Sequence, residues 1–177
     1  GDNVDQNFDN YSVEYTFDDG TKFFMFGRTM AGCHDEFASY AHGQNGLAVI
    51  SSEGHWPSKA RIYKTQKMVN SDIVWRTPKE GPTMDPYLLE WEDLIDAIKN
   101  DKPYNEVERG AQASLVTAMG RFAAHTGQVV KYDEYLNNPH EFAPNVESFD
   151  MKSAAPVVAE GGKYLIPRPG MLKDREY

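Results

Sequence analysis

The hydrophobic periodicity of this chain changes near Asp85, and that change constrains the fold more than any other feature. Before Asp85, several short segments alternate apolar and polar residues with a period of two, as half-buried β-strands do. After Asp85, apolar residues recur every three or four positions, as on one face of an α-helix. Strands followed by helices, without regular alternation between them, predict an α+β fold.

The first strand pair is predicted around a tight turn. Residues 11–17 alternate apolar and polar side chains, and Asp19-Gly20 is a strong signal for a two-residue hairpin turn. Residues 21–30 then return as the partner strand. In the register that this turn imposes, Tyr11 shares a face with Arg28, because facing residues of an antiparallel pair point to the same side.

A second hairpin is predicted from residues 36–42 to residues 47–52, with Asn45-Gly46 as its turn. Weaker strand patterns cover residues 60–65 and 72–76. Short strands joined by tight turns indicate antiparallel neighbours, since parallel strands need long crossover connections. The strands are therefore expected to form an open, mostly antiparallel sheet.

Two helices are predicted after the strands. Asp85 is a suitable N-cap with Pro86 at the first helical position, and Asn105 with Glu108 resembles a capping box for a second helix. Gly127 is suited to end that helix. Each helix has an apolar stripe for packing on one face of the sheet: Leu88, Trp91, Leu94, Ile95 and Ile98 in the first, and Val107, Ala111, Leu115, Ala118 and Phe122 in the second.

The chain is expected to lose regular structure toward its C-terminal end. The sequence predicts a short strand over residues 128–132 and one more helical turn over residues 133–138. Beyond them, prolines at positions 139, 144, 156, 167 and 169 exclude long regular elements. The sequence thus divides into a domain over residues 1–138 and an extended Pro-rich tail over residues 139–177, packed on the domain or on a partner.

Composition and motif spacing exclude several classes of function. A net charge of −9 disfavours nucleic acid and anionic membranes as partners, and the longest apolar run, residues 46–52, is too short to span a bilayer. The sequence contains neither the G-x-G-x-x-G fingerprint nor a P-loop, and no two histidines stand at the spacing of a zinc motif. No catalytic, cofactor-binding or metal-binding residue is therefore assigned.

Two residues are candidates for ligand contacts. Arg28 ends a predicted strand beside Phe24 and Phe26, where a guanidinium could hold a carboxylate or sugar hydroxyls; the alternative is a surface arginine lying over apolar side chains. His34 precedes Asp35 and Glu36 in the densest group of potential metal ligands. Because neighbouring strand residues face opposite sides, an ordinary polar strand entry is the simpler interpretation.

The segment over residues 85–131 carries the pattern D-P-Y-x-x-E…D-L-I-x-A-I-x-x-x-K-P-x-N-E…A…G-R…T-G-x-V-V. This pattern resembles the C-terminal domain of Gfo/Idh/MocA-type oxidoreductases, the glucose–fructose oxidoreductase and inositol dehydrogenase family. Residues 11–28 resemble the first hairpin of that domain. The closing motif resembles a subgroup with a shortened, Pro-rich end: Gly162-Lys163-Tyr164…Pro167-Arg168-Pro169-Gly170.

The resemblance implies a function in two parts. Family members bind NAD or NADP in an N-terminal Rossmann domain that also holds the catalytic lysine, and their C-terminal domain supplies substrate contacts and subunit interfaces. This chain is therefore expected to lack its own Rossmann domain and to be inactive alone. It would serve as the substrate-binding and oligomerisation domain of an enzyme acting on a sugar, polyol or derivative, with Asp9, Arg28 and His34 as substrate contacts and the sheet as the homo-oligomer interface.

Two positions depart from the family pattern, and two other functions stay open. Asn10 and Trp91 occupy positions where relatives often have histidine, so substrate choice is not transferable. The chain could instead be a non-enzymatic carbohydrate-binding or dimerisation module, or part of an NAD-dependent glycosidase of the same family. Neither a cytoplasmic nor an exported location is assigned.

Overall fold

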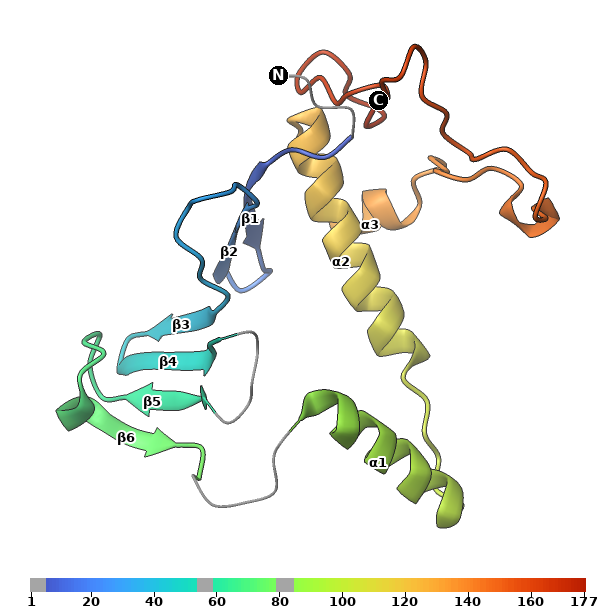
Figure 1. Cartoon of the computed structure of the whole chain (residues 1–177). Helices are drawn as coiled ribbons and strands as arrows, with labels where there is room; N and C mark the ends of the chain where they lie inside the picture. Colours follow the sequence, from blue (N-terminus) through green and yellow to red (C-terminus); the bar gives the residue numbers. More distant parts are fainter. Residues whose placement is uncertain (1–5, 54–58, 79–84) are drawn as a thin grey trace. The chain divides into compact units, whose positions relative to one another are not determined.

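The computed structural model describes residues 6–53, 59–78 and 85–177. The chain divides into two compact units, one formed by Gly1–Ala31 with Glu106–Tyr177 and the other by Gly32–Asn105. Antiparallel strands and α-helices occur in an α+β arrangement, so the predicted class is confirmed (Figure 1). The strands lie in two sheets of two and four strands rather than in one.

The first unit pairs strand β1 (Asn10–Thr16) with β2 (Lys22–Arg28) beside helix α2 (Val107–Thr126). A short helix, α3 (Tyr132–Leu136), follows α2, and a 3-10 turn covers Val146–Ser148. The hairpin contacts α2 through β1, and α2 also contacts α3. The rest of the C-terminal segment has no strand among its described residues, apart from isolated bridges such as Glu160 with Lys163.

The turn of the first hairpin is one residue longer than predicted. The Gly20 amide donates to the Phe17 carbonyl and the Phe17 amide donates to the Thr21 carbonyl, both at 2.9 Å, so Asp18, Asp19 and Gly20 form a three-residue loop. Gly20 has a positive φ of 83°, as the last position of such a loop requires.

This longer loop reverses the predicted faces of the hairpin. Tyr11 pairs with Gly27, whereas Arg28 pairs with Asn10. Because a slip of one residue moves every side chain to the other face, Tyr11 and Arg28 lie on opposite sides of the hairpin. The predicted shared face of Tyr11 and Arg28 was therefore wrong.

Helix α2 packs closely on β1 through small residues. Val13 is buried, and the Tyr15 hydroxyl donates to the Val116 carbonyl at 3.2 Å. Gly120 allows this approach, since a Cβ atom there would lie 1.8 Å from the Tyr15 hydroxyl oxygen. Of the stripe predicted for α2, Phe122 is buried while Val107 is exposed, so only the C-terminal half of the stripe is covered.

The ends of α2 agree only in part with the prediction. Gly127 ends the helix in the left-handed conformation, with φ at 68°, as expected. The capping box at Asn105 was wrong, because Glu106 occupies the N-cap position and Asn105 stands one residue too early to cap Val107. The strand predicted over residues 128–132 was also wrong: residues 128–131 form no strand, and Tyr132 begins α3.

The second unit contains a four-stranded antiparallel sheet in sequence order, followed by helix α1. Leu47, Val49 and Tyr63 form its buried core, with Ile73 packed against them. The elements are β3 (Ser39–Gly43), β4 (Gly46–Ser51), β5 (Arg61–Tyr63), the 3-10 turn η2 (Asn70–Asp72), β6 (Ile73–Arg76) and α1 (Pro86–Lys99). All four strands were predicted; three had longer bounds, and β4 was predicted one residue later at the same length.

The turn between β3 and β4 differs by one position from the predicted Asn45-Gly46. Gly43 pairs with Gly46, so Gln44 and Asn45 occupy the turn and Gly46 belongs to the strand. Gly46 has φ at 151°, and a Cβ atom there would lie 2.1 Å from the Tyr63 carbonyl oxygen. Glycine is thus required at this position for close approach of β5 as well as for the turn.

Helix α1 begins as predicted but does not bury its stripe. The Asp85 carboxylate accepts a hydrogen bond of 3.0 Å from the Tyr87 amide, with Pro86 at the first helical position. Ala97 is the buried residue of α1, whereas Trp91 is 62% exposed. No helix within the described residues is long and apolar enough to cross a membrane.

Candidate ligand-binding site

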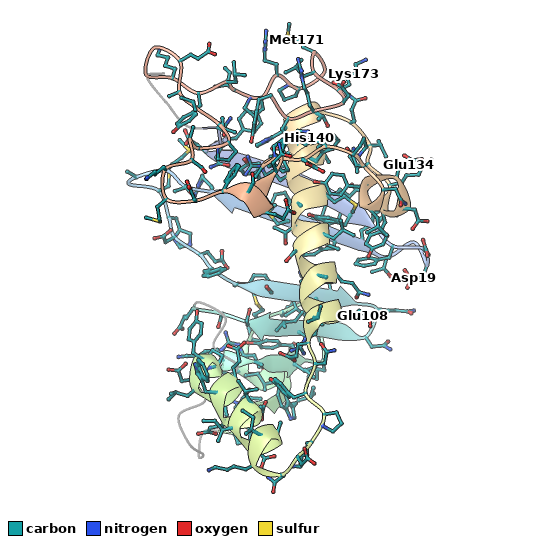
Figure 2. The ribbon with its side chains drawn as sticks, turned by 90° about the vertical axis from the view of Figure 1, so that its right-hand side faces the viewer. Asp19, Glu108, Glu134, His140, Met171 and Lys173 are labelled. Carbon is teal, nitrogen blue, oxygen red and sulfur yellow. The ribbon has the colours of Figure 1, made fainter. Side chains whose placement is uncertain are left out.

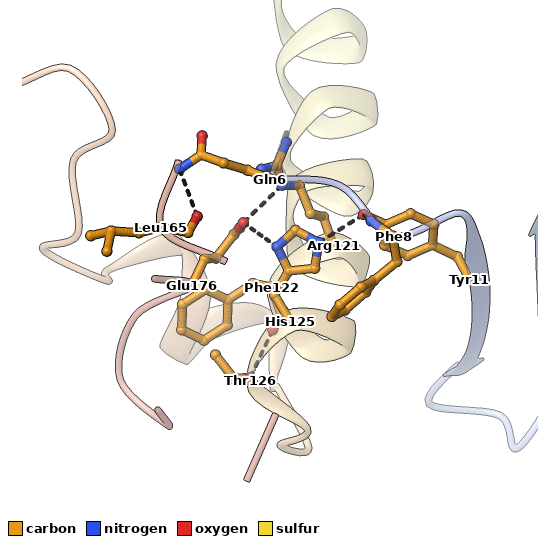
Figure 3. A network of polar contacts seen from close by, with 9 residues as sticks. All are labelled: Gln6, Phe8, Tyr11, Arg121, Phe122, His125, Thr126, Leu165 and Glu176. Atoms are coloured by element: carbon orange, nitrogen blue, oxygen red, sulfur yellow. Dashed lines mark hydrogen bonds and ion pairs between the residues drawn. The ribbon is translucent and has the colours of Figure 1, made fainter. Parts of the chain in front are cut away.

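Glu176 is the centre of a buried polar network in the first unit (Figure 3). Its Oε2 atom accepts hydrogen bonds from Nε of Arg121 at 2.8 Å and from Nδ1 of His125 at 2.6 Å. The side chains of His125 and Glu176 are fully buried, and that of Arg121 is 37% exposed. Arg121 and His125 are four residues apart on α2, so the helix presents both on one face to the C-terminal segment.

Tyr11 extends this network from strand β1. Its hydroxyl lies 2.7 Å from Nε2 of His125 and accepts a hydrogen bond of 3.2 Å from the Phe8 amide. A carboxylate only accepts, so in the neutral imidazole Nδ1 donates to Glu176 and Nε2 accepts from Tyr11. The Phe8 ring meets the His125 ring edge-on at 5.0 Å, which further fixes the imidazole.

The network keeps both members of its ion pair charged. Burial by itself would raise the pKa of Glu176, but the hydrogen bonds from His125 and Arg121 and the charge of Arg121 lower this pKa below its ordinary value. Burial would likewise lower the pKa of Arg121, and the hydrogen bond and charge of Glu176 raise it. The pair is therefore ionised at neutral pH and contributes no net charge.

A cavity of about 490 Å³ lies beside this network and within the same unit. Arg121 and Glu176 contribute charged groups to its wall, Gln6 and Asn7 contribute amides, and Phe142 and Tyr177 contribute rings. The Phe142 ring lies 6.3 Å from the Tyr177 ring, and the Arg121 guanidinium lies 5.9 Å from the Phe142 ring centre. Polar groups and flat apolar surfaces thus converge on one space.

One buried side-chain oxygen of the residues around the cavity has no hydrogen-bond partner within the described part of the chain. It is Oε1 of Glu176, the carboxylate oxygen that receives neither Arg121 nor His125. A buried acceptor without a donor costs stability, and the hydrogen bonds from Arg121 and His125 to Oε2 offset that cost.

A second cavity of about 340 Å³ lies along α2 and α3, lined by Ser114, Tyr135, Asn138 and His140 together with apolar residues of α2. His140, labelled in Figure 2, has its ring edge-on to that of Phe142, with 4.6 Å between the ring centres. Its Nε2 atom is buried and has no hydrogen-bond partner among the described residues. No Asp, Glu, Lys or Arg among the described residues lines this smaller cavity.

The three residues predicted as substrate contacts lie elsewhere. Asp9 and Arg28 are exposed at adjoining ends of the first hairpin, where the Thr29 amide donates to the Asp9 carbonyl at 2.9 Å. His34 is exposed and belongs to the second unit, ahead of β3. None of the three lines either cavity.

Sequence reasoning missed the residues of the buried network. Arg121 and His125 at helical spacing beside small residues were a usable signal, because polar residues on a packed helix face need partners. Glu176 gave no such signal, since it lies 51 positions beyond His125 in a segment without periodicity. No group of three or more His, Cys, Asp or Glu residues in the described ranges could hold a metal ion.

Comparison with family models, with curated proteins and with solved structures finds no match for this chain. The site is therefore interpreted from its own residues.

Proposed function

We propose that this chain is the substrate-binding and oligomerisation domain of an NAD(P)-dependent oxidoreductase that acts on a sugar, polyol or derivative. The observation that carries the proposal is the 490 Å³ cavity, whose wall combines Arg121, Glu176 and amide groups with aromatic rings. Its volume is within the usual range for small-molecule sites. The family resemblance of residues 85–131 supplies the reaction class.

The described residues do not fit the dinucleotide itself. Pyrophosphate binding of the Rossmann type needs a Gly-rich turn between a strand and a helix N-terminus. Residues 100–106, which precede α2, contain no glycine, and α3 follows a helix rather than a strand. The proposal therefore assigns NAD or NADP to a separate Rossmann-type domain, and no hydride-transfer step is placed on this chain.

This chain would bind and orient the substrate. Arg121, which is 37% exposed, offers a hydrogen-bond donor at a fixed position, and the rings of Phe142 and Tyr177 offer apolar surface for the C–H face of a sugar. The hydrogen bonds of His125 hold the Glu176 carboxylate in place. Such fixed contacts restrict the poses in which a bound polyol can meet a reactant supplied from another domain.

The association part of the proposal is supported by an exposed apolar sheet face. Ile62 stands opposite Ala48 on one side and Trp75 on the other, and Ile50 lies two residues beyond Ala48 on the same face. Ile50, Ile62 and Trp75 are all exposed. Contiguous apolar surface of this kind is typical of interfaces, and a homo-oligomer through the sheet would cover it.

Titration of the chain with neutral sugars and polyols, followed by NMR and calorimetry, tests the proposal. We expect D-glucose or a related polyol to shift the amide signals of residues around the cavity. NAD⁺ should give no binding isotherm, because the pyrophosphate cradle is missing from the described residues. A clear micromolar NAD⁺ isotherm, or no response to any sugar or polyol, would contradict the proposal.

A further inference from the structure

We infer that helix α1 pairs with α1 of a second copy of this chain, with the two helices antiparallel and related by a two-fold axis. The interface is the exposed apolar stripe of α1, formed by Leu88, Trp91, Ile95 and Ile98. This surface is separate from the sheet face used in the proposed function, so each contact can be tested without the other.

The apolar stripe of α1 is uncovered in the described part of the chain, whereas the other side of the helix is not. The four stripe residues are between 45% and 71% exposed. On the other side, Ala97 is buried and its carbonyl accepts a hydrogen bond of 2.9 Å from the Lys102 amide. Nζ of Lys102 also pairs with Asp96 at 2.7 Å. The segment that follows α1 therefore covers one side of the helix and leaves the stripe for a partner.

The spacing of the stripe is that of a helix that pairs with another helix. Its residues follow one another at intervals of three, four and three positions, which is the a/d pattern of a coiled-coil seam. Glu92 and Lys99 flank the stripe on one side, and Tyr87 and Leu94 flank it on the other. An apolar seam with a charged flank is typical of helices that associate through matching faces.

The charges at the two ends of α1 favour the antiparallel orientation. Asp85 caps the N-terminal end, and Lys99 lies in the last turn. In a parallel pair each of these charges would meet its own copy, and the two helix dipoles would point the same way. In an antiparallel pair Asp85 meets Lys99 of the second copy at both ends, and the dipoles oppose each other. Asp85 uses Oδ1 to cap the helix, so its Oδ2 can accept from that lysine.

The two-fold axis that brings these ends together also matches the apolar residues of the stripe. Leu88 then packs on Ile98 of the second copy, and Trp91 packs on Ile95, so every member of the stripe meets an apolar partner. Leu94 is half-buried in the single chain and lies beside the axis, where it meets its own copy. The stripe is thus complementary to itself in this one register.

The size of the contact predicts a reversible pair. Helix α1 has 14 residues, and a helix of that size is roughly 21 Å long. Interfaces below about 1,200 Å² of total buried area are typical of transient complexes. We therefore expect a dissociation constant in the micromolar range and an exchange between monomer and dimer that depends on concentration.

Sedimentation equilibrium of the whole chain tests the pairing in the Ile62→Glu background, where a charge disrupts the sheet face. Ile62→Glu should still form a dimer as its concentration rises. Adding Ile95→Glu should weaken that dimer at least about tenfold, because the two-fold interface would hold two carboxylates without partners.

Glu92→Gln in the same background tests the register. The two-fold axis places Glu92 close to Glu92 of the second copy, so the two carboxylates repel each other. Their removal should tighten the dimer about twofold to threefold. A parallel pair would instead place Glu92 beside Tyr87 of the second copy, with no repulsion to remove. The matched control is Glu90→Gln, which removes the same charge from an exposed position of α1 turned away from the stripe and should leave the affinity unchanged.

The outcomes separate this contact from the sheet interface. A monomer at every concentration of Ile62→Glu, or a dimer that Ile95→Glu does not weaken, overturns the inference and leaves the proposed function standing. Equal affinities of Glu92→Gln and Glu90→Gln overturn the antiparallel register. If Ile95→Glu loses the circular-dichroism signal of its helices, the comparison of Glu92→Gln with Glu90→Gln decides alone.

Discussion

At the scale of single residues, Glu176 has the largest consequence, because a buried carboxylate is tolerated only while its partners are present. His125 and Arg121 both donate to one oxygen, and their combined effect exceeds the cost of burial. Removing the carboxylate charge would leave the guanidinium of Arg121 without its counterion, and that loss is generally larger than the net value of the pair.

Glu176→Gln should therefore lower stability in a pH-dependent way. The folded-state pKa of Glu176 lies below its ordinary value of 4.5, so the unfolded chain takes up the proton first as pH falls. The stabilisation is fully present above pH 4.5 and is lost as pH falls through the folded-state pKa. At pH 7 the variant should lose about 2–3 kcal/mol of unfolding free energy, measured by urea denaturation.

The difference between the variant and the wild-type chain should shrink at pH 3, where the carboxylate is increasingly protonated in both states. Glu134→Gln is the control, and its exposed site should change stability by less than about 0.5 kcal/mol at either pH. An equal loss for Glu176→Gln at pH 7 and pH 3 would show that the carboxylate charge has no stabilising role.

Residue-level prediction from the sequence was limited by distance along the chain. Tyr11 was predicted to lie in a half-buried strand, and it does, but the partner that defines its role is His125, 114 positions away. Periodicity reports which residues share a face and carries no information on which distant segment meets that face. The roles of Asp9, Arg28 and His34 in substrate binding stay predictions.

At the scale of elements, local chemistry predicted more of the structure. The N-cap at Asp85, the left-handed Gly127 and every strand of the two sheets follow from spacing and turn residues. Turn lengths were less predictable, because Asp-Gly sequences fit both two-residue and three-residue loops. The one additional loop residue shifts the strand pairing by one position, and this shift decides which face of the hairpin Tyr11 occupies.

The contact between α2 and β1 depends on Gly120. A Cβ atom at this position would lie 1.8 Å from the hydroxyl oxygen of Tyr15 and 3.5 Å from a methyl carbon of Val13. Gly120→Ala should therefore destabilise the chain by about 1–3 kcal/mol in denaturant unfolding, because overpacking exceeds the gain in helix propensity.

Gly110→Ala is the matched control on the same helix. Apart from the local backbone of α2, no described atom lies within 4 Å of a Cβ atom built at Gly110, so alanine there should stabilise the chain by up to about 1 kcal/mol. Equal effects of the two substitutions would mean that α2 and β1 do not pack as described.

At the scale of the whole molecule, the exposed apolar face of the four-stranded sheet predicts self-association. Ile62, 44% exposed at the centre of that face, should contribute to the interface. The wild-type chain should show a concentration-dependent increase in mass by light scattering, and Ile62→Glu should shift it toward the monomer, because a buried unpaired carboxylate opposes association.

Val129→Glu provides the control for this experiment. Val129 is 96% exposed, lies between α2 and α3 in the sequence and belongs to no strand. Its substitution adds the same charge without changing the sheet, so association should persist. A wild-type chain that stays monomeric at every concentration, or equal loss of association in both variants, would exclude the sheet as the interface.

The order of the two units along the chain has a consequence for synthesis on the ribosome. The first unit is discontinuous, with Gly32–Asn105 placed between its two stretches, and its buried network joins Tyr11 to Glu176. Translation completes all residues of the second unit before α2 exists, whereas the network from Tyr11 through His125 cannot form fully until Glu176 has emerged. Nascent chains stalled before position 170 would therefore contain every residue of the second unit but would lack Glu176, which the buried network of the first unit needs.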